Sequence, residues 1–153
     1  MPPRLDPVTF RPVRASDLDV LLALAQAFHA EDGHVLDERG RRALAAIVAG
    51  EPMARAWLFE ADGRAVGYGV ATLGFSVEHG GRDGFLDDLY LAPEARGRVL
   101  GRQAMEFLEG AALKLGMGVL HLEIGRDNAR AQALYEARGF RENGRRLMSK
   151  RLA

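Results

Sequence analysis

Two polar side chains seven residues apart, Asn128 and Tyr135, lie in a segment whose local signals favour a short helix. Asp127 or Asn128 can cap its N-terminus, its alanine-rich spacing suits a helix, and Gly139 is typical of a left-handed C-terminal stop. With about 3.6 residues per turn, positions 128 and 135 share one helix face, so the amide and the phenol can point at one ligand. Alternatively, Tyr135 is a half-buried core aromatic with a hydrated hydroxyl, and Asn128 is only a cap.

A second candidate site lies earlier in the chain, where a turn rich in arginine and glycine follows an apolar strand and precedes a helix. Exposed backbone amides and the positive end of the helix dipole favour an anion there, and Gly97 and Gly101 let the backbone come close. The side chains of Arg96, Arg98 and Arg102 add charge for phosphates. The turn lacks the Lys-Ser/Thr pair of a nucleotide-hydrolase P-loop and the dinucleotide GxGxxG spacing, so it predicts a different phosphate site.

The elements that must position these residues follow from hydrophobic periodicity and turn signals. A helix begins at Ser16, a second is capped by Asp37, and Asp62-Gly63 is a strong hairpin signal. Residues 74–84 are expected to form a loop or strand end. Because a helix connects residues 85–91 to residues 119–124, those two strands are expected to run parallel. The expected strands are 8–13, 54–61, 64–73, 85–91 and 119–124, with one or two closing strands in 140–152, and the later helices are 100–115 and 128–138.

The two motifs, in this order and spacing, resemble the GNAT superfamily of acyl-CoA-dependent N-acetyltransferases. The family's pyrophosphate loop reads Arg/Gln-x-x-Gly-x-Gly/Ala; Arg96 and Gly101 match it, whereas Val99 occupies the usual glycine position. The family's later helix reads Asn-x-x-Ala-x-x-x-Tyr followed by Gly-Phe. That pattern is matched by Asn128, Ala131, Tyr135, Gly139 and Phe140.

The resemblance implies an α/β (α+β) fold with a mixed, mostly antiparallel central sheet, a splayed parallel strand pair and flanking helices. A bulge in the first strand of that pair would open a slot for the pantetheine arm of acetyl-CoA. An amide near Leu91 would polarise the thioester carbonyl, and the amides of residues 97–102 would meet the pyrophosphate. The implied contacts to acetyl-CoA are Leu89, Tyr90, Leu91, Arg96, Gly97, Arg98, Val99, Leu100, Gly101, Arg102 and Asn128.

The chemistry implied by the resemblance is direct attack of a neutral amine on acetyl-CoA, with Tyr135 protonating the leaving sulfur. A base must first deprotonate the amine, and Asp87 and Asp88 are the nearest acidic candidates. We expect Asp87 to be the base and Asp88 to be structural within the acceptor site; alternatively, both are solvated acids at the strand end. Strand alternation sends the two to opposite faces unless the bulge redirects one of them.

The acceptor pocket of the family is usually lined by the segment after the first helix, which here contains His29, Glu31, Asp32 and His34. Such side chains would suit a cationic amine, and His29 or His34 is an alternative base; the segment could also be a solvated helix end. The expected acceptor is a small-molecule primary amine, such as a polyamine, an aminoglycoside or an amino acid derivative. The alternatives are a protein N-terminus or lysine, a non-catalytic acyl-CoA-binding regulatory domain, or an interaction protein.

Composition bounds these expectations. The 153 residues, 48% of them hydrophobic, fit one N-acetyltransferase domain over residues 1–153. The absence of cysteine excludes disulfides and a thiol nucleophile, and the histidines show no metal-ligand spacing, so no metal is expected. Balanced charge, 21 basic against 21 acidic residues, argues against nucleic-acid or membrane partners. The first four residues lack a signal-peptide core, so a cytoplasmic enzyme is expected, and the resemblance implies a possible homodimer.

Overall fold

The computed structural model describes residues 7–153, so the expectation drawn from the first four residues lies outside the described residues. The chain has two compact units, the first ending at Glu123 and the second being Ile124–Ala153. Among residues 7–153, no helix combines the length and the apolar character needed to cross a membrane.

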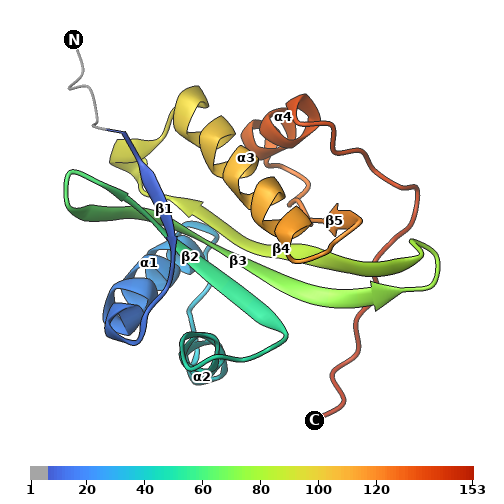
Figure 1. Cartoon of the computed structure of the whole chain (residues 1–153), viewed down its shortest axis with the longest axis horizontal. Coiled ribbons are helices and arrows are strands. Elements are labelled where there is room, and N and C mark those ends of the chain that lie inside the picture. The colour runs from blue at the N-terminus through green and yellow to red at the C-terminus, as the bar shows by residue number, and fades with distance from the viewer. Residues whose placement is uncertain (1–6) are drawn as a thin grey trace. The chain divides into compact units, whose positions relative to one another are not determined.

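The first unit is built on a five-stranded sheet whose strands follow chain order (Figure 1). The first four strands pair antiparallel, and the last two pair parallel, which confirms the expected mixed sheet with a parallel pair. The strands are β1 Thr9–Pro12, β2 Ala54–Ala61, β3 Arg64–Ser76, β4 Gly81–Leu91 and β5 Val119–His121.

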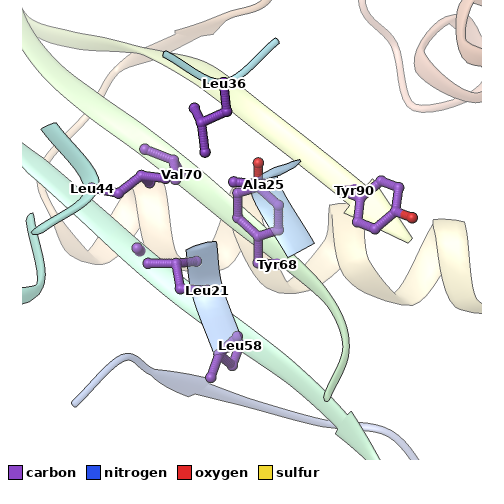
Figure 2. Packing of buried hydrophobic residues seen from close by; sticks show 9 residues of the cluster. Leu21, Ala25, Leu36, Leu44, Leu58, Tyr68, Val70 and Tyr90 are labelled. Atoms are coloured by element: carbon purple, nitrogen blue, oxygen red, sulfur yellow. The ribbon is translucent and has the colours of Figure 1, made fainter. Parts of the chain in front are cut away.

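Helices cover both faces of this sheet (Figure 1). One face carries the 3₁₀ turn η1 Ala15–Asp17, α1 Leu18–Glu31 and α2 Glu38–Val48, and the other carries α3 Arg98–Lys114, which follows the 3₁₀ turn η2 Pro93–Ala95. On the α1 and α2 face, apolar side chains of both helices pack against strand residues to form the buried cluster of Figure 2. Its labelled members are Leu21, Ala25, Leu36, Leu44, Leu58, Tyr68, Val70 and Tyr90.

The face toward α3 depends on a glycine in β3. A Cβ atom added to Gly69 would lie 3.0 Å from Cδ2 of Leu108 in α3, tighter than most carbon contacts, so the missing side chain lets the helix approach the strand. The ring of Phe107 in α3 stacks on that of Phe10 in β1, with centroids 4.9 Å apart. This packing fixes α3, and hence the turn before it, against the sheet.

Two local signals read from the sequence are confirmed. Asp62 and Gly63 have φ of 53° and 73°, the left-handed pair that joins β2 to β3 in a tight hairpin. Asp37 caps α2, since its Oδ1 accepts a hydrogen bond of 2.9 Å from the amide of Gly40.

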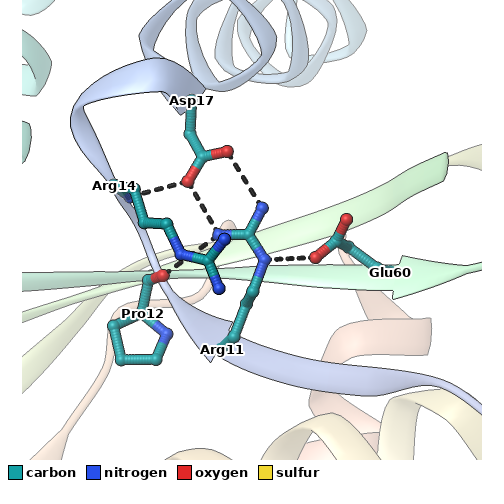
Figure 3. A network of polar contacts seen from close by, with 5 residues as sticks. All are labelled: Arg11, Pro12, Arg14, Asp17 and Glu60. Carbon is teal, nitrogen blue, oxygen red and sulfur yellow. Dashed lines mark hydrogen bonds and ion pairs between the residues drawn. The ribbon is translucent and has the colours of Figure 1, made fainter. Parts of the chain in front are cut away.

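An ion-pair network that the sequence did not reveal ties β1 and β2 to the start of α1 (Figure 3). The guanidinium of Arg11 donates to both carboxylate oxygens of Asp17, at 2.8 and 2.9 Å, and its Nε donates to Glu60. The amide of Arg14 donates to the same carboxylate, at 2.6 Å. The hydrogen bonds from Arg11 lower the pKa of Asp17 to about 2.

Two expectations about elements, for residues 119–124 and 140–152, are wrong, and the alternative left open for residues 74–84 is resolved as strand ends joined by a turn. Residues 74–84 are mostly strand: β3 runs to Ser76 and β4 begins at Gly81, with a turn closed by the amide of Gly80 donating to the Val77 carbonyl (3.2 Å). Its glycines left this segment open between loop and strand, although residues 73–76 pair in register with residues 81–84. The strand expected over 119–124 ends at His121. Residues 141–153 contain no strand; every one of them is exposed, so no packed apolar face supports a ladder there.

Candidate active site

A bulge in β4 sets the geometry of the site. In the β3–β4 ladder Val70 pairs with Asp88 and Ala71 pairs with Leu86, which leaves Asp87 as the extra residue. The bulge therefore lies in the first strand of the parallel pair, as expected. It also overrides the simple alternation of the strand, because Asp87 and Asp88 line the same cavity.

That cavity, here the α2 cavity, has a volume of about 140 Å³ and lies on the α1 and α2 face of the sheet. Most of its wall is hydrocarbon from α2, from the loop before it and from β3. Its acidic and imidazole groups come from β4 and α1. The lining residues are His29, Leu36, Gly40, Ala43, Leu44, Ile47, Val70, Asp87 and Asp88.

The two carboxylates of the α2 cavity differ in their surroundings. Asp88 accepts a hydrogen bond of 2.8 Å from the hydroxyl of Tyr68, a side chain with 0% exposure. Burial raises the pKa of Asp88, the charge of Asp87 acts in the same direction, and the bond from Tyr68 opposes them. Burial, together with the charge of Asp88, also raises the pKa of the Tyr68 phenol. Asp88 is thus anchored, whereas Asp87 is exposed.

The imidazole of the α2 cavity has a defined tautomer. Nδ1 of His29 lies 2.9 Å from the carbonyl oxygen of Ala25. A carbonyl can only accept, so Nδ1 carries the proton in this contact. Nε2 is then the nitrogen of His29 that can accept a proton.

A second cavity, here the splay cavity, has a volume of about 80 Å³ and lies where β4 and β5 diverge. The parallel ladder pairs residues 83–85 with 119–121, and the cavity begins where that pairing stops. Its lining residues are Phe85, Leu86, Asp87 and Glu123. Asp87 consequently lines both the α2 cavity and the splay cavity.

The expected phosphate turn forms the N-terminus of α3. Helical hydrogen bonding starts with the amide of Gly101 donating to the carbonyl of Gly97 (3.1 Å), so the amides of residues 98–100 point out of the helix end. Val99 is helical and 61% exposed; within residues 7–153 the non-glycine residue with positive φ is Asp62. The branched side chain of Val99 therefore meets no backbone strain. The side chain of Arg98 lies outside the described part of the structure.

Two side chains expected in different subsites contact each other. The guanidinium of Arg96 forms an ion pair with Glu31 at the end of α1, and its Nε donates to the carbonyl of Leu91 (2.9 Å). The same guanidinium lies 5.7 Å from the ring centre of Tyr90, which is buried in the core cluster. Arg96 thus connects the end of β4 to the end of α1.

The remaining expected site residues are distributed around this framework. Asp32 and His34 are exposed in the turn after α1, and Arg102 is exposed on α3. Leu89 and Leu91 are half-buried in β4, and Leu100 and Gly101 are buried in the first turns of α3. The sequence reading missed the cavity walls. The apolar residues of α2 matched an ordinary core face, as did Leu36 before the helix and Val70 in β3, so no local signal distinguished the wall residues: Leu36, Gly40, Ala43, Leu44, Ile47 and Val70.

The second unit contains α4 Ala129–Ala137. Asn128 is confirmed as its N-cap, because its Oδ1 accepts from the amide of Ala131 (3.1 Å), and Gly139 has the expected left-handed φ of 93°. The ring of Tyr135 packs edge-on against that of Phe140, with centroids 5.9 Å apart. The Tyr135 phenol is protonated at neutral pH, as an ordinary tyrosine is, and burial raises its pKa further.

Comparison with known proteins identifies the family. The sequence model described as the acetyltransferase (GNAT) family matches residues 21–140, most of the chain. The chain belongs to the GNAT acetyltransferase family. It is an N-acetyltransferase, as the motifs of residues 96–101 and 128–140 indicated.

Similar proteins agree with this assignment. The IAA acetyltransferase of Azospirillum brasilense is 29% identical over 121 residues, which are 79% of this chain and 71% of that protein. An integron cassette protein, HFX_CASS3, from the mobile metagenome of Cole Harbour Salt Marsh is 35% identical with a TM-score of 0.82, covering 94% of this chain and 90% of that one. The aminoglycoside N-acetyltransferase AAC(6′)-Iy, solved with CoA, has a TM-score of 0.79 at 16% identity, covering 100% and 99%, and shares the fold.

Proposed function

We propose that this GNAT enzyme transfers the acetyl group of acetyl-CoA to the primary amine of a small molecule. The observation that carries the proposal is the position of Asp87, which lines both the α2 cavity and the splay cavity. An amine held in the first cavity and a thioester held in the second would meet at this carboxylate.

The residues at the turn before α3 fit an acyl-CoA. Outward amides of residues 98–100 at the helix N-terminus suit the anionic pyrophosphate, and the helical conformation of Val99 leaves its own amide among them. Bound acetyl-CoA would supply the acetyl carbon as an activated thioester.

The chain's own groups would then manage the protons. Asp87 takes a proton from the substrate ammonium so that the neutral amine can attack, and the backbone near Leu91 polarises the thioester oxygen. Tyr135, a phenol that is protonated at neutral pH, gives its proton to the departing sulfur. The nitrogen–carbon bond forms and the carbon–sulfur bond breaks, CoA leaves as the thiol, and the extra proton on the new amide nitrogen is lost to water, from which Tyr135 regains its own.

The experiment has two stages. Calorimetric titration of the purified protein with acetyl-CoA should give micromolar binding, weaker when Arg96 and Arg98 are replaced by Ala. Thiol release is then followed with a panel of small amines. Absence of binding would overturn the proposal, and binding without thiol release from any amine would favour a non-catalytic acyl-CoA-binding domain.

The role of Asp87 is tested within the same assay. Asp87→Asn should lower kcat/KM by about 100-fold, in the range usual for loss of a general base, with the acetyl-CoA Kd unchanged. Asp19→Asn, at an exposed position on α1, is the matched control and should retain activity. Full turnover in Asp87→Asn would remove this carboxylate from the mechanism.

A further inference from the structure

We infer that the acceptor is a small apolar monoamine, a single ammonium group on a hydrocarbon body of about the size of a benzene ring, bound in the α2 cavity. This inference rests on the proposed function and narrows it. Three features of the α2 cavity support it: its size, its hydrocarbon wall and the position of its charged groups.

Size sets the first limit. The α2 cavity has a volume of about 140 Å³, and a cavity of about 150 Å³ in another protein accommodates benzene. The cavity is partly open to solvent, so its volume limits the part of a ligand that is enclosed, and an aminoglycoside could place only a fraction of itself there. An alkyl chain of a few carbons or one aromatic ring fills it.

The wall sets the second limit. Leu36, Leu44 and Val70 belong to the buried core cluster, with exposures of 6%, 6% and 2%, and Ile47 packs against that cluster. These side chains offer hydrocarbon to a ligand and no partner for a hydroxyl or a second ammonium group. Placing an unpaired polar group there is unfavourable, because the group gives up its hydrogen bonds to water and gains none. The wall therefore favours a ligand body without polar atoms.

The position of charge sets the third limit. Titratable side chains of the α2 cavity are confined to His29 and the two β4 carboxylates. Asp88 is already engaged by the Tyr68 hydroxyl, which leaves Asp87 as the exposed carboxylate that can face an ammonium ion. One accessible anion at one end of a hydrocarbon pocket matches one cation at one end of a hydrocarbon ligand.

Two residues of α2 with a small side chain or none leave space in the α2 cavity. Gly40 has no side chain, and a Cβ atom there would come within 2.7 Å of Cδ1 of Leu36. Ala43 lies one turn further along α2 and is exposed, so a larger side chain there can be accommodated without disturbing the core. Ala46, on the same helix, is also exposed but lies outside the cavity lining, which makes it a matched control.

The test compares amines in two readouts, thiol release and direct binding by ligand-detected NMR. Benzylamine and pentylamine should give kcat/KM at least tenfold above ethylamine, spermidine and kanamycin, and benzylamine should bind in the absence of acetyl-CoA. A preference for spermidine or kanamycin would overturn the inference while leaving the proposed function intact. Benzylamine binding without any thiol release would support the pocket assignment and overturn the proposed function instead. Failure of benzylamine to bind or react overturns the inference.

Variants of the cavity lining test whether the amine binds in the α2 cavity. Ala43→Leu should raise the KM for benzylamine at least fivefold and leave that for ethylamine within twofold, whereas Ala46→Leu should change neither. Ile47→Ala enlarges the cavity and should shift preference toward a bulkier amine such as 1-naphthylmethylamine. In each variant an unchanged acetyl-CoA Kd shows that the fold is retained. Equal effects of Ala43→Leu and Ala46→Leu on all amines would contradict binding in the α2 cavity.

Discussion

The hydroxyl of Tyr68 in β3 donates a hydrogen bond of 2.8 Å to the carboxylate of Asp88 in β4, beside the bulge that carries Asp87. The bond fixes one of two adjacent carboxylates inside the sheet and leaves the other exposed to both cavities. Two neighbouring aspartates thereby acquire different surroundings. The difference originates in the register of the two strands.

Tyr68→Phe should raise the pKa of Asp88 further, because the bond from Tyr68 lowers it against the effect of burial. The loss of a partner for a buried carboxylate should also reduce the free energy of unfolding by about 1–3 kcal/mol. Carboxyl ¹³C NMR during a pH titration measures the first effect and urea unfolding the second. Tyr90→Phe, opposite Tyr68 in the ladder, is the control; an unchanged Asp88 pKa in Tyr68→Phe would contradict the assignment.

Asp17→Asn should lower the free energy of unfolding by about 2 kcal/mol at neutral pH. The hydrogen bonds from Arg11 lower the pKa of Asp17 from 3.8 to about 2 in the folded state. The contribution of Asp17 to the free energy of unfolding is therefore complete above pH 3.8 and is lost as the pH falls through about 2. The difference between wild type and variant in urea unfolding should therefore shrink between about pH 4 and pH 2. Asp19→Asn should show no such trend, and a difference that is constant with pH would rule out the ion pair as its source.

Glu31→Gln should tighten acetyl-CoA binding by about two- to tenfold. The substitution removes the carboxylate that forms an ion pair with the guanidinium of Arg96, next to the phosphate turn. The positive charge of Arg96 is then no longer balanced by Glu31 and attracts an anionic ligand more strongly. Glu38→Gln, at an exposed position that starts α2, changes the net charge equally and controls for long-range effects. Calorimetry that shows weaker binding in Glu31→Gln would mean that the ion pair holds Arg96 in its binding position.

Val99→Gly should leave acetyl-CoA binding unchanged or tighten it. Val99 already has helical backbone angles, so glycine relieves no strain, and its cost is limited to roughly 0.5–1 kcal/mol of helix stability. Thermal unfolding measures the change in stability, and calorimetry measures the change in acetyl-CoA affinity. A loss of affinity of tenfold or more, about 1.4 kcal/mol, would show that the pyrophosphate turn is misplaced.

Tyr135→Phe should lower turnover by roughly 10- to 1000-fold with little change in acetyl-CoA affinity, because it removes an acid and keeps the ring. The ring contact with Phe140 survives the substitution, so α4 should stay folded. Single-turnover thiol release together with calorimetry distinguishes a loss of proton transfer from a loss of binding. Unchanged turnover would exclude Tyr135 from the reaction.

The features that could be predicted from the amino-acid sequence depend on a few neighbouring residues. The caps Asp37 and Asn128, the hairpin at Asp62-Gly63 and the stop at Gly139 all formed as expected. Each is fixed by backbone dihedral preferences and hydrogen bonds within about five residues. Motif order also pointed to the family, which the family match confirms.

Contacts between residues far apart in the chain could not be predicted in this way and are known from the folded structure. The bulge at Asp87 requires the register of β3 against β4, the Tyr68–Asp88 bond joins residues 20 apart, and the Arg96–Glu31 pair joins residues 65 apart. Part of the wall of the α2 cavity comes from a helix stripe that looks like any core face until β4 lies opposite it. Local propensity carries no information on such pairings, because their energy depends on the packing of elements that the chain brings together only when it folds.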